Sequence, residues 1–117
     1  MTRRLFNQCL CLIFFLSFET NATEYFITLK AHLFYPSQIT IPANKKVKLI
    51  IENQDNTPEE FDSFDLNREK VLYPHRKSII YIGPLSEGRY EFFGEFSPNT
   101  AQGVVIVTNA EVVNANN

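Results

Sequence analysis

Cysteine is missing from almost the whole chain. The only two, Cys9 and Cys11, lie in a segment that starts with basic residues, continues as an apolar run over residues 5–18 and ends in small residues at Ala22. This pattern is typical of a secretory signal peptide. Its removal would leave a domain without cysteine, which excludes disulfides, thiolate metal ligands and a cysteine nucleophile.

A long hydrophobic run is missing as well. The apolar run at residues 5–18 falls short of the roughly 20 residues that a membrane-spanning helix needs. We therefore expect cleavage rather than anchoring, and no membrane insertion after cleavage. The predicted division is a signal peptide at 1–22, a folded domain at 23–108 and a flexible tail at 109–117.

Basic residues are too few and too scattered for a nucleic-acid surface. The chain has 11 basic and 13 acidic residues, and cleavage after Ala22 takes away Arg3, Arg4 and Glu19, which leaves nine basic against twelve acidic residues. Phosphate neutralisation needs clustered lysines and arginines. A weakly acidic domain without such a cluster is therefore not expected to have a nucleic-acid partner.

No long helical period occurs, and the chain instead contains about seven short β-favouring segments separated by turns. These segments are residues 24–30, 38–41, 47–52, 69–72, 78–82, 90–95 and 103–107. The pattern predicts an all-β Greek-key sandwich. Seven of the 11 phenylalanines lie beyond residue 22, and we expect their rings to give a dense core in place of disulfides.

The stretch from residue 90 to 107, YEFFGEFSPNTAQGVVIV, predicts an aromatic strand, a tight loop and a closing apolar strand. A type 1 copper loop would supply a Cys, a His and often a Met in such a stretch. Gly94, Ser97 and Ala101 stand in their approximate places, and Glu95 is the only ionisable side chain of the loop. The sequence therefore predicts no type 1 copper.

Three segments carry a resemblance to a known family: FYPSQITIPANKKVKLIIEN, PEEFDSFDLNREKVLYP and GPLSEGRYEFFGEFSPNTAQGVVIV. In that order they resemble the EfeO-type cupredoxin-like domain, and most closely the small exported FtrB-like proteins that accompany bacterial ferrous-iron permeases. The resemblance implies a cupredoxin fold, a periplasmic location and a role in iron uptake, with copper and iron bound to help oxidise ferrous iron. It also implies a first copper-site histidine at the position of Glu60, and a further histidine at the position of Ser97.

Five residues are candidate metal ligands: His32, Glu60, Asp62, Glu69 and Glu95. In a strand Glu60 and Asp62 point to the same side, and Glu95 leaves its strand where the end loops of a sandwich gather. Carboxylate oxygens with one imidazole suit ferrous or ferric iron better than cuprous copper. The expected cofactor is an iron or copper ion, and the expected partner is an iron permease or another exported subunit.

Each candidate ligand also has a structural interpretation. His32 can be a solvated histidine at a strand end, Glu69 can be an exposed charge between basic neighbours, and the acidic residues at 59–62 can form a solvated loop.

A second function also stays open at this point. A metal-free interaction module would dock a partner through Phe96 and Tyr35 at the loop end. An enzyme is disfavoured, because no nucleophile-elbow motif accompanies the serines of the chain.

Overall fold

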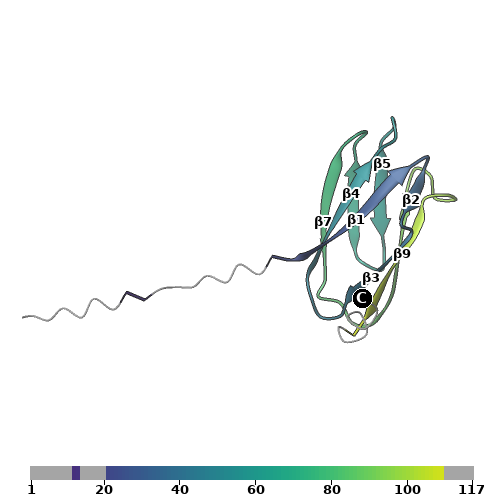
Figure 1. The fold of residues 1–117 in the computed structure, drawn as a ribbon. Helices are drawn as coiled ribbons and strands as arrows, with labels where there is room; N and C mark the ends of the chain where they lie inside the picture. The colour runs from purple at the N-terminus through teal and green to yellow at the C-terminus, as the bar shows by residue number, and fades with distance from the viewer. Residues whose placement is uncertain (1–11, 14–20, 110–117) are drawn as a thin grey trace, which may run out of the picture.

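The fold is a pair of packed β-sheets (Figure 1), seen in a computed structural model that describes residues 12–13 and 21–109. The strands of this described part are β1 Thr23–Lys30, β2 Leu33–Tyr35, β3 Gln38–Pro42, β4 Val47–Asn53, β5 Glu59–Ser63, β6 Arg68–Leu72, β7 Lys77–Ile82, β8 Gly88–Gly94 and β9 Gln102–Thr108. None of the described segments is a helix with the length and hydrophobicity needed to cross a bilayer.

The strands divide into two sheets. Sheet A has the order β2-β1-β4-β7, and sheet B has the order β3-β9-β8-β5-β6. The pairs β1–β4 and β3–β9 are parallel, and the other neighbours are antiparallel. The predicted all-β sandwich is confirmed.

The core lies between the sheets. Every second side chain of a strand points into it, because successive side chains point to opposite faces. Val47, Leu49 and Ile51 of β4 are at most 1% exposed, and Ile27 of β1 packs with them. Phe26, which alternates with Ile27 along β1, is 61% exposed. The alternation of side chains therefore divides β1 and β4 each into a buried face and an outer face.

The aromatic part of the core is smaller than predicted. Phe34, Phe61 and Phe92 are buried, with the ring of Phe92 centred 5.2 Å from that of Phe34 and 5.0 Å from that of Phe61. The other phenylalanines beyond residue 22 are exposed or half-buried: Phe26, Phe64, Phe93 and Phe96. Strand geometry explains part of this difference, because adjacent residues such as Phe92 and Phe93 cannot both face inward.

Two strands were not predicted. β2 is short and forms because Ala31 and His32, both with positive φ (51° and 59°), turn the chain back onto β1. β5 lies in the segment at residues 59–65 that the sequence left without an assignment, and it pairs with β6 on one side and β8 on the other. Residues 59–62 are thus a strand and not a solvated loop.

The described strands run from Thr23 to Thr108, which are the limits predicted for the folded domain. Most of the predicted signal peptide at 1–22 and of the predicted tail at 109–117 lies outside the described residues. Those two divisions stay predictions.

The start of β5 and the end of β8 lie side by side. The two strands are antiparallel, and Gly94 at the end of β8 stands opposite Phe61 near the start of β5. The loop that follows Gly94 leads back into β9, which pairs with β8 on its other side. This arrangement brings the EEFDS and FFGEF segments together.

Candidate metal centre

Three carboxylates meet on the outer face of sheet B. Phe61 points into the core, so its neighbours Glu60 and Asp62 point outward from β5. Glu69 on β6 stands opposite Asp62. One oxygen from each of the three side chains lies within 4.8 Å of the other two. We call Glu60, Asp62 and Glu69 the carboxylate cluster.

Asp62 is the least exposed member of the cluster. It is 8% exposed, and its Oδ1 is buried without a hydrogen-bond partner among the described residues. A buried, unpaired carboxylate oxygen costs free energy, and native proteins usually pair such atoms with a donor, a water or an ion. Oδ1 of Asp62 is therefore available to accept a hydrogen bond or to coordinate an ion.

Glu95, the residue that follows β8, lies beside the carboxylate cluster. Its backbone N–H donates to the carbonyl oxygen of Glu60 at 2.9 Å, which extends the β5–β8 pairing by one residue. A hydrogen bond with the Asp62 carboxyl raises the pKa of Glu95, and burial and the negative charges of Asp62 and Glu59 raise it further.

The pKa of Asp62 is raised too. Burial is the main cause of the raised pKa, and a hydrogen bond that the Asp62 carboxyl donates to Glu60 and the negative charges of Glu60 and Glu69 add to it. The contact with Glu95 acts in the opposite direction. These directions fit a proton that Asp62 and Glu95 share, with Glu95 as the donor.

No ion pair neutralises the carboxylate cluster in the described part of the chain, since the ion pairs found there lie elsewhere. Arg68, next to Glu69 in sequence, turns its guanidinium to backbone carbonyls, donating to Tyr81 O at 3.0 Å, Asn67 O at 2.9 Å and Leu66 O at 3.4 Å. The fold thus gathers like charges, which is unfavourable unless they are protonated or bind a cation.

The surface beside the cluster is hollowed. A hollow of about 370 Å³ is lined by Asp62, Phe64, Arg68 and Glu69, among others. It leaves room for a hydrated ion to approach the carboxylates from solvent.

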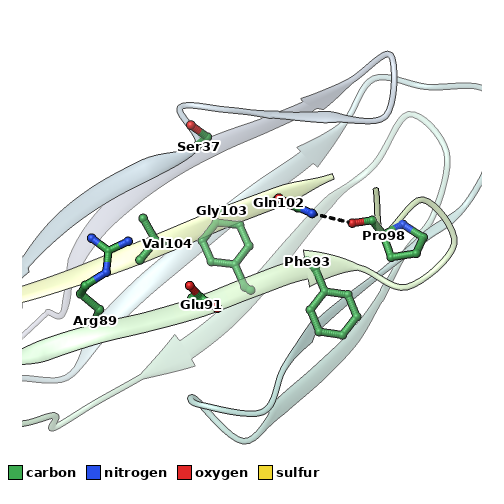
Figure 2. A pocket seen from close by; sticks show the side chains of 9 residues that line it. Ser37, Arg89, Glu91, Phe93, Pro98, Gln102, Gly103 and Val104 are labelled. Carbon is green, nitrogen blue, oxygen red and sulfur yellow. Dashed lines mark hydrogen bonds between the residues drawn. The ribbon is translucent and has the colours of Figure 1, made fainter. Parts of the chain in front are cut away.

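A separate groove of about 500 Å³ crosses the outer face of β8 and β9 (Figure 2). Arg89 and Glu91 line one end, and Pro98 and Gln102 line the other, where Gln102 Nε2 donates to Pro98 O at 3.0 Å. None of the five predicted ligands lines this groove. It is therefore a feature distinct from the carboxylate cluster.

His32 does not join the carboxylate cluster. It lies in the turn between β1 and β2, where Asp55 accepts hydrogen bonds from the backbone N–H groups of Ala31 (2.7 Å) and His32 (3.0 Å). The imidazole Nδ1 lies 3.8 Å from Asp55 Oδ2, and the side chain is 53% exposed. The structure thus brings together four of the predicted ligands and separates the histidine, which pairs with Asp55.

Glu59 is a site residue that the sequence interpretation missed. It is 2% exposed, and its Oε1 accepts hydrogen bonds from the backbone N–H groups of Glu60 (2.9 Å) and Phe96 (2.7 Å). Its other oxygen, Oε2, is buried without a partner among the described residues. The side chain therefore ties the loop after β8 to the start of β5. Its position on the same strand face as Phe61 could have predicted its inward direction.

The residues present do not fit a type 1 copper ion. A Cβ added at Gly94 would lie 2.6 Å from Cδ of Glu59 and 2.7 Å from Cβ of Ala101. The carboxyl of Glu59 thus fills the space beside the position where a thiolate would stand, and neither Ser97 nor Ala101 offers a soft or imidazole donor.

One detail implied by the resemblance concerns Glu60. Glu60 was expected in the place of the first copper-site histidine, but Glu60 points outward to the carboxylate cluster. Glu59 faces Gly94 and Ala101 instead, because it is Glu59 that shares the inward face of β5 with Phe61.

The arrangement as a whole offers four carboxyl groups on one outer face and no sulfur or imidazole among them. Oxygen-only sites of this kind bind hard or borderline cations. The chemistry within reach is therefore cation binding and release, coupled to protons through Asp62 and Glu95.

Known proteins share both the sequence pattern and the fold. The profile of the family described as cupredoxin-like domain matches residues 7–107. Uncharacterized protein RP394 of Rickettsia prowazekii (strain Madrid E) is 47% identical over 89 residues, which are 76% of this chain and 71% of that protein.

Solved structures with a similar fold include two copper proteins. The metal binding domain of the Cu(I) exporting P-type ATPase CopA from Streptococcus pneumoniae D39, solved with Cu(I), has a TM-score of 0.65 at 15% identity over 78% of this chain and 90% of that one. Auracyanin A, a "blue" copper protein from Chloroflexus aurantiacus, has a TM-score of 0.65 at 10% identity over 75% of this chain and all (100%) of that one. At these identities the likeness shows the fold alone.

The matched residues 7–107 contain almost every strand of the sandwich, and β9 ends one residue beyond them. The family profile and the fold agree. The chain belongs to the cupredoxin-like domain family.

Proposed function

We propose that this chain is an exported metal-binding accessory protein of an iron uptake system, and that it holds its ion with the carboxylate cluster and Glu95. One observation carries the proposal. Asp62 Oδ1 is buried without a hydrogen-bond partner, inside a group of carboxylates that has no basic partner among the described residues. A cation bound there would satisfy this oxygen and neutralise the charge.

Iron suits this ligand set better than cuprous copper. Carboxylate oxygens are hard donors, whereas cuprous copper is favoured by thiolates and thioethers. The only sulfur-containing residues of the chain are Met1, Cys9 and Cys11, all within the predicted signal peptide. Copper is the second candidate ion, because it is the metal named for two proteins of the same fold.

The role in iron uptake and the periplasmic location rest on the resemblance to EfeO-type and FtrB-like proteins and on the signal-peptide pattern at residues 1–22. In this setting the domain delivers ferrous iron to a permease or assists its oxidation. Binding is the primary activity in this proposal, because one-electron oxidation needs a redox partner that carboxylates do not supply.

The test is titration calorimetry of the mature protein with ferrous iron under anaerobic conditions, ferric citrate and cupric ion. We expect binding of iron that is lost in Asp62→Asn and in the double variant Glu60→Gln with Glu95→Gln. A matched control, Glu24→Gln with Glu87→Gln, removes the same charge from exposed positions outside the cluster. Equal affinity in the cluster and control variants would remove the site.

A metal-free interaction module is the second candidate function. Phe96 is 57% exposed at the loop after β8, and Tyr35 is 53% exposed at the end of β2. Exposed aromatic side chains of this kind are common in protein interfaces. Thermal unfolding separates the two functions, since an ion that binds only the native state must raise the melting temperature. A melting temperature that no metal changes would favour the interaction module.

A further inference from the structure

The outer face of sheet A carries an apolar row that no described residue covers. Phe26, Ile50 and Ile79 are direct neighbours across β1, β4 and β7. Phe26 is 61% exposed and Ile79 is 46% exposed, while Ile50 between them is half-buried. We call Phe26, Ile50 and Ile79 the apolar row.

Charged and polar residues flank the apolar row on both sides, in an ordered way. On one side stand Glu24, Lys48 and Tyr81, and on the other side stand Thr28, Glu52 and Lys77. We call the first set the lysine row and the second set the glutamate row, after their central residues on β4. The three rows are consecutive on the outer face, because residues two apart on a strand share a face.

We propose that this face is the interface of a symmetric dimer of this chain, packed sheet against sheet about a two-fold axis that runs along the apolar row. Such an axis places each residue of the apolar row against its own copy. It also places the lysine row of one protomer over the glutamate row of the other, since a two-fold interface is self-complementary.

The charges of the flanking rows agree with this axis. Lys48, which also pairs with Glu24 of its own chain at 3.2 Å, faces Glu52 of the partner. Tyr81, which already has Lys46 Nζ of its own chain 4.8 Å from its ring centroid, faces Lys77 of the partner. Glu24 meets the uncharged Thr28. Symmetry produces every one of these contacts twice.

The other simple two-fold axis is disfavoured by the same residues. An axis along the strands would place Lys48 against its own copy, and two like charges in a desolvated interface are strongly unfavourable. The register of β1, β4 and β7 therefore selects one mode of pairing. Two sheets packed in this mode lie about 10 Å apart with strands aligned to within about 30°.

The opposite face of the molecule does not offer a comparable surface. The outer face of sheet B bears the carboxylate cluster and Glu95, whose like charges would repel those of a second copy. The dimer proposal does not depend on metal binding, because the carboxylate cluster remains on the solvent side of the pair.

Sedimentation velocity of the mature protein over a wide concentration range tests the proposal. We expect a monomer–dimer equilibrium in which Phe26→Ser raises the dissociation constant by about tenfold or more, equal to about 1.4 kcal/mol. Phe64→Ser is the matched control, since Phe64 is an 86% exposed phenylalanine outside this face; it should leave the equilibrium unchanged.

A charge swap tests the axis itself. Lys48→Glu should weaken the dimer, because it places two glutamates in contact at both symmetry-related positions, and the double variant Lys48→Glu with Glu52→Lys should restore it. A protein that stays monomeric at every concentration overturns the proposal. So does a dimer that resists Phe26→Ser, and failure of the double variant to restore association overturns the axis. Circular dichroism and the melting temperature of each variant show whether it is folded.

Discussion

Glu59 is a buried acid with a structural role. Its substitution should separate the effect of losing its hydrogen bonds from the effect of losing its negative charge. Glu59→Ala removes the acceptor for the backbone N–H groups of Glu60 and Phe96 and leaves a cavity beside Gly94. We expect a loss of about 2–4 kcal/mol in the free energy of unfolding, measured by urea denaturation.

Glu59→Gln is the control for this loss. Its amide oxygen can still accept both hydrogen bonds, and its free energy of unfolding should stay within about 1 kcal/mol of the wild type. Hydrogen exchange at the Phe96 amide should be faster in the alanine variant than in the glutamine variant. Equal destabilisation by the two substitutions would contradict the assigned role and point to the negative charge of Glu59.

Asp62 should make stability depend on pH in the absence of metal. Folding raises the pKa of Asp62 above its ordinary value of 3.8, and that of Glu95 above 4.5. The native state then binds more protons than the unfolded state as pH rises above these ordinary values. The free energy of unfolding should therefore decrease as pH rises through the folded pKa values of the pair.

Urea unfolding between pH 4 and neutrality, in the presence of a chelator, measures this dependence. Asp62→Asn should flatten it, and should be more stable than the wild type at neutral pH. Added metal should make the wild type more stable than Asp62→Asn, because only the wild type gains binding free energy. A wild type and variant that differ by a constant amount at every pH would exclude the titration of this cluster as the cause.

At the scale of the element, the β1–β2 turn depends on Asp55. Ala31 and His32 both have positive φ, which is unfavourable for residues other than glycine. Asp55 offsets this cost by accepting both backbone N–H groups. Asp55→Ala should lower the free energy of unfolding by about 1–3 kcal/mol in urea denaturation. His32→Gly should not cause this loss, since glycine tolerates a positive φ.

The same turn should make the free energy of unfolding depend on pH in the direction opposite to that of the Asp62 and Glu95 pair. Desolvation alone would raise the pKa of Asp55, but the His32 and Ala31 amides, with the His32 and His75 imidazoles, outweigh it and lower the pKa. The stability that Asp55 contributes is therefore present above its ordinary pKa of 3.8 and is lost as pH falls through the folded value. Asp55→Ala should show less acid destabilisation than the wild type.

Strands with simple alternation were predictable, and strands with buried charge were not. In β4 every second residue is apolar and buried, so the pattern alone predicted the strand and its inner face. In β5 the acidic Glu59 and Asp62 are buried, so hydrophobicity does not distinguish its two faces. Only pairing with β6 and β8, which are distant in sequence, makes this segment a strand. β2 is too short for any period to be recognised.

At the scale of the whole molecule, the sequence predicted the sandwich and most of the acidic residues that converge. Glu60 and Asp62 could be paired by their spacing alone, since they are two residues apart on one strand. The approach of Glu69 and Glu95 depends on which strands flank β5, and His32 was included although its turn leads it to Asp55. Local spacing therefore accounts for the pair on β5, whereas the sequence had no physical means to separate Glu69 and Glu95, which approach that pair, from His32, which does not.

The position of β9 also determines when sheet B can be completed. β9 is the last of the described strands, yet it lies between β3 and β8 and holds them in one sheet. Until residues 102–108 have been synthesised, β3 has no partner in sheet B, and a chain cut before Gln102 would leave that sheet in two pieces. Sheet B can therefore assemble only after every other described strand is already available.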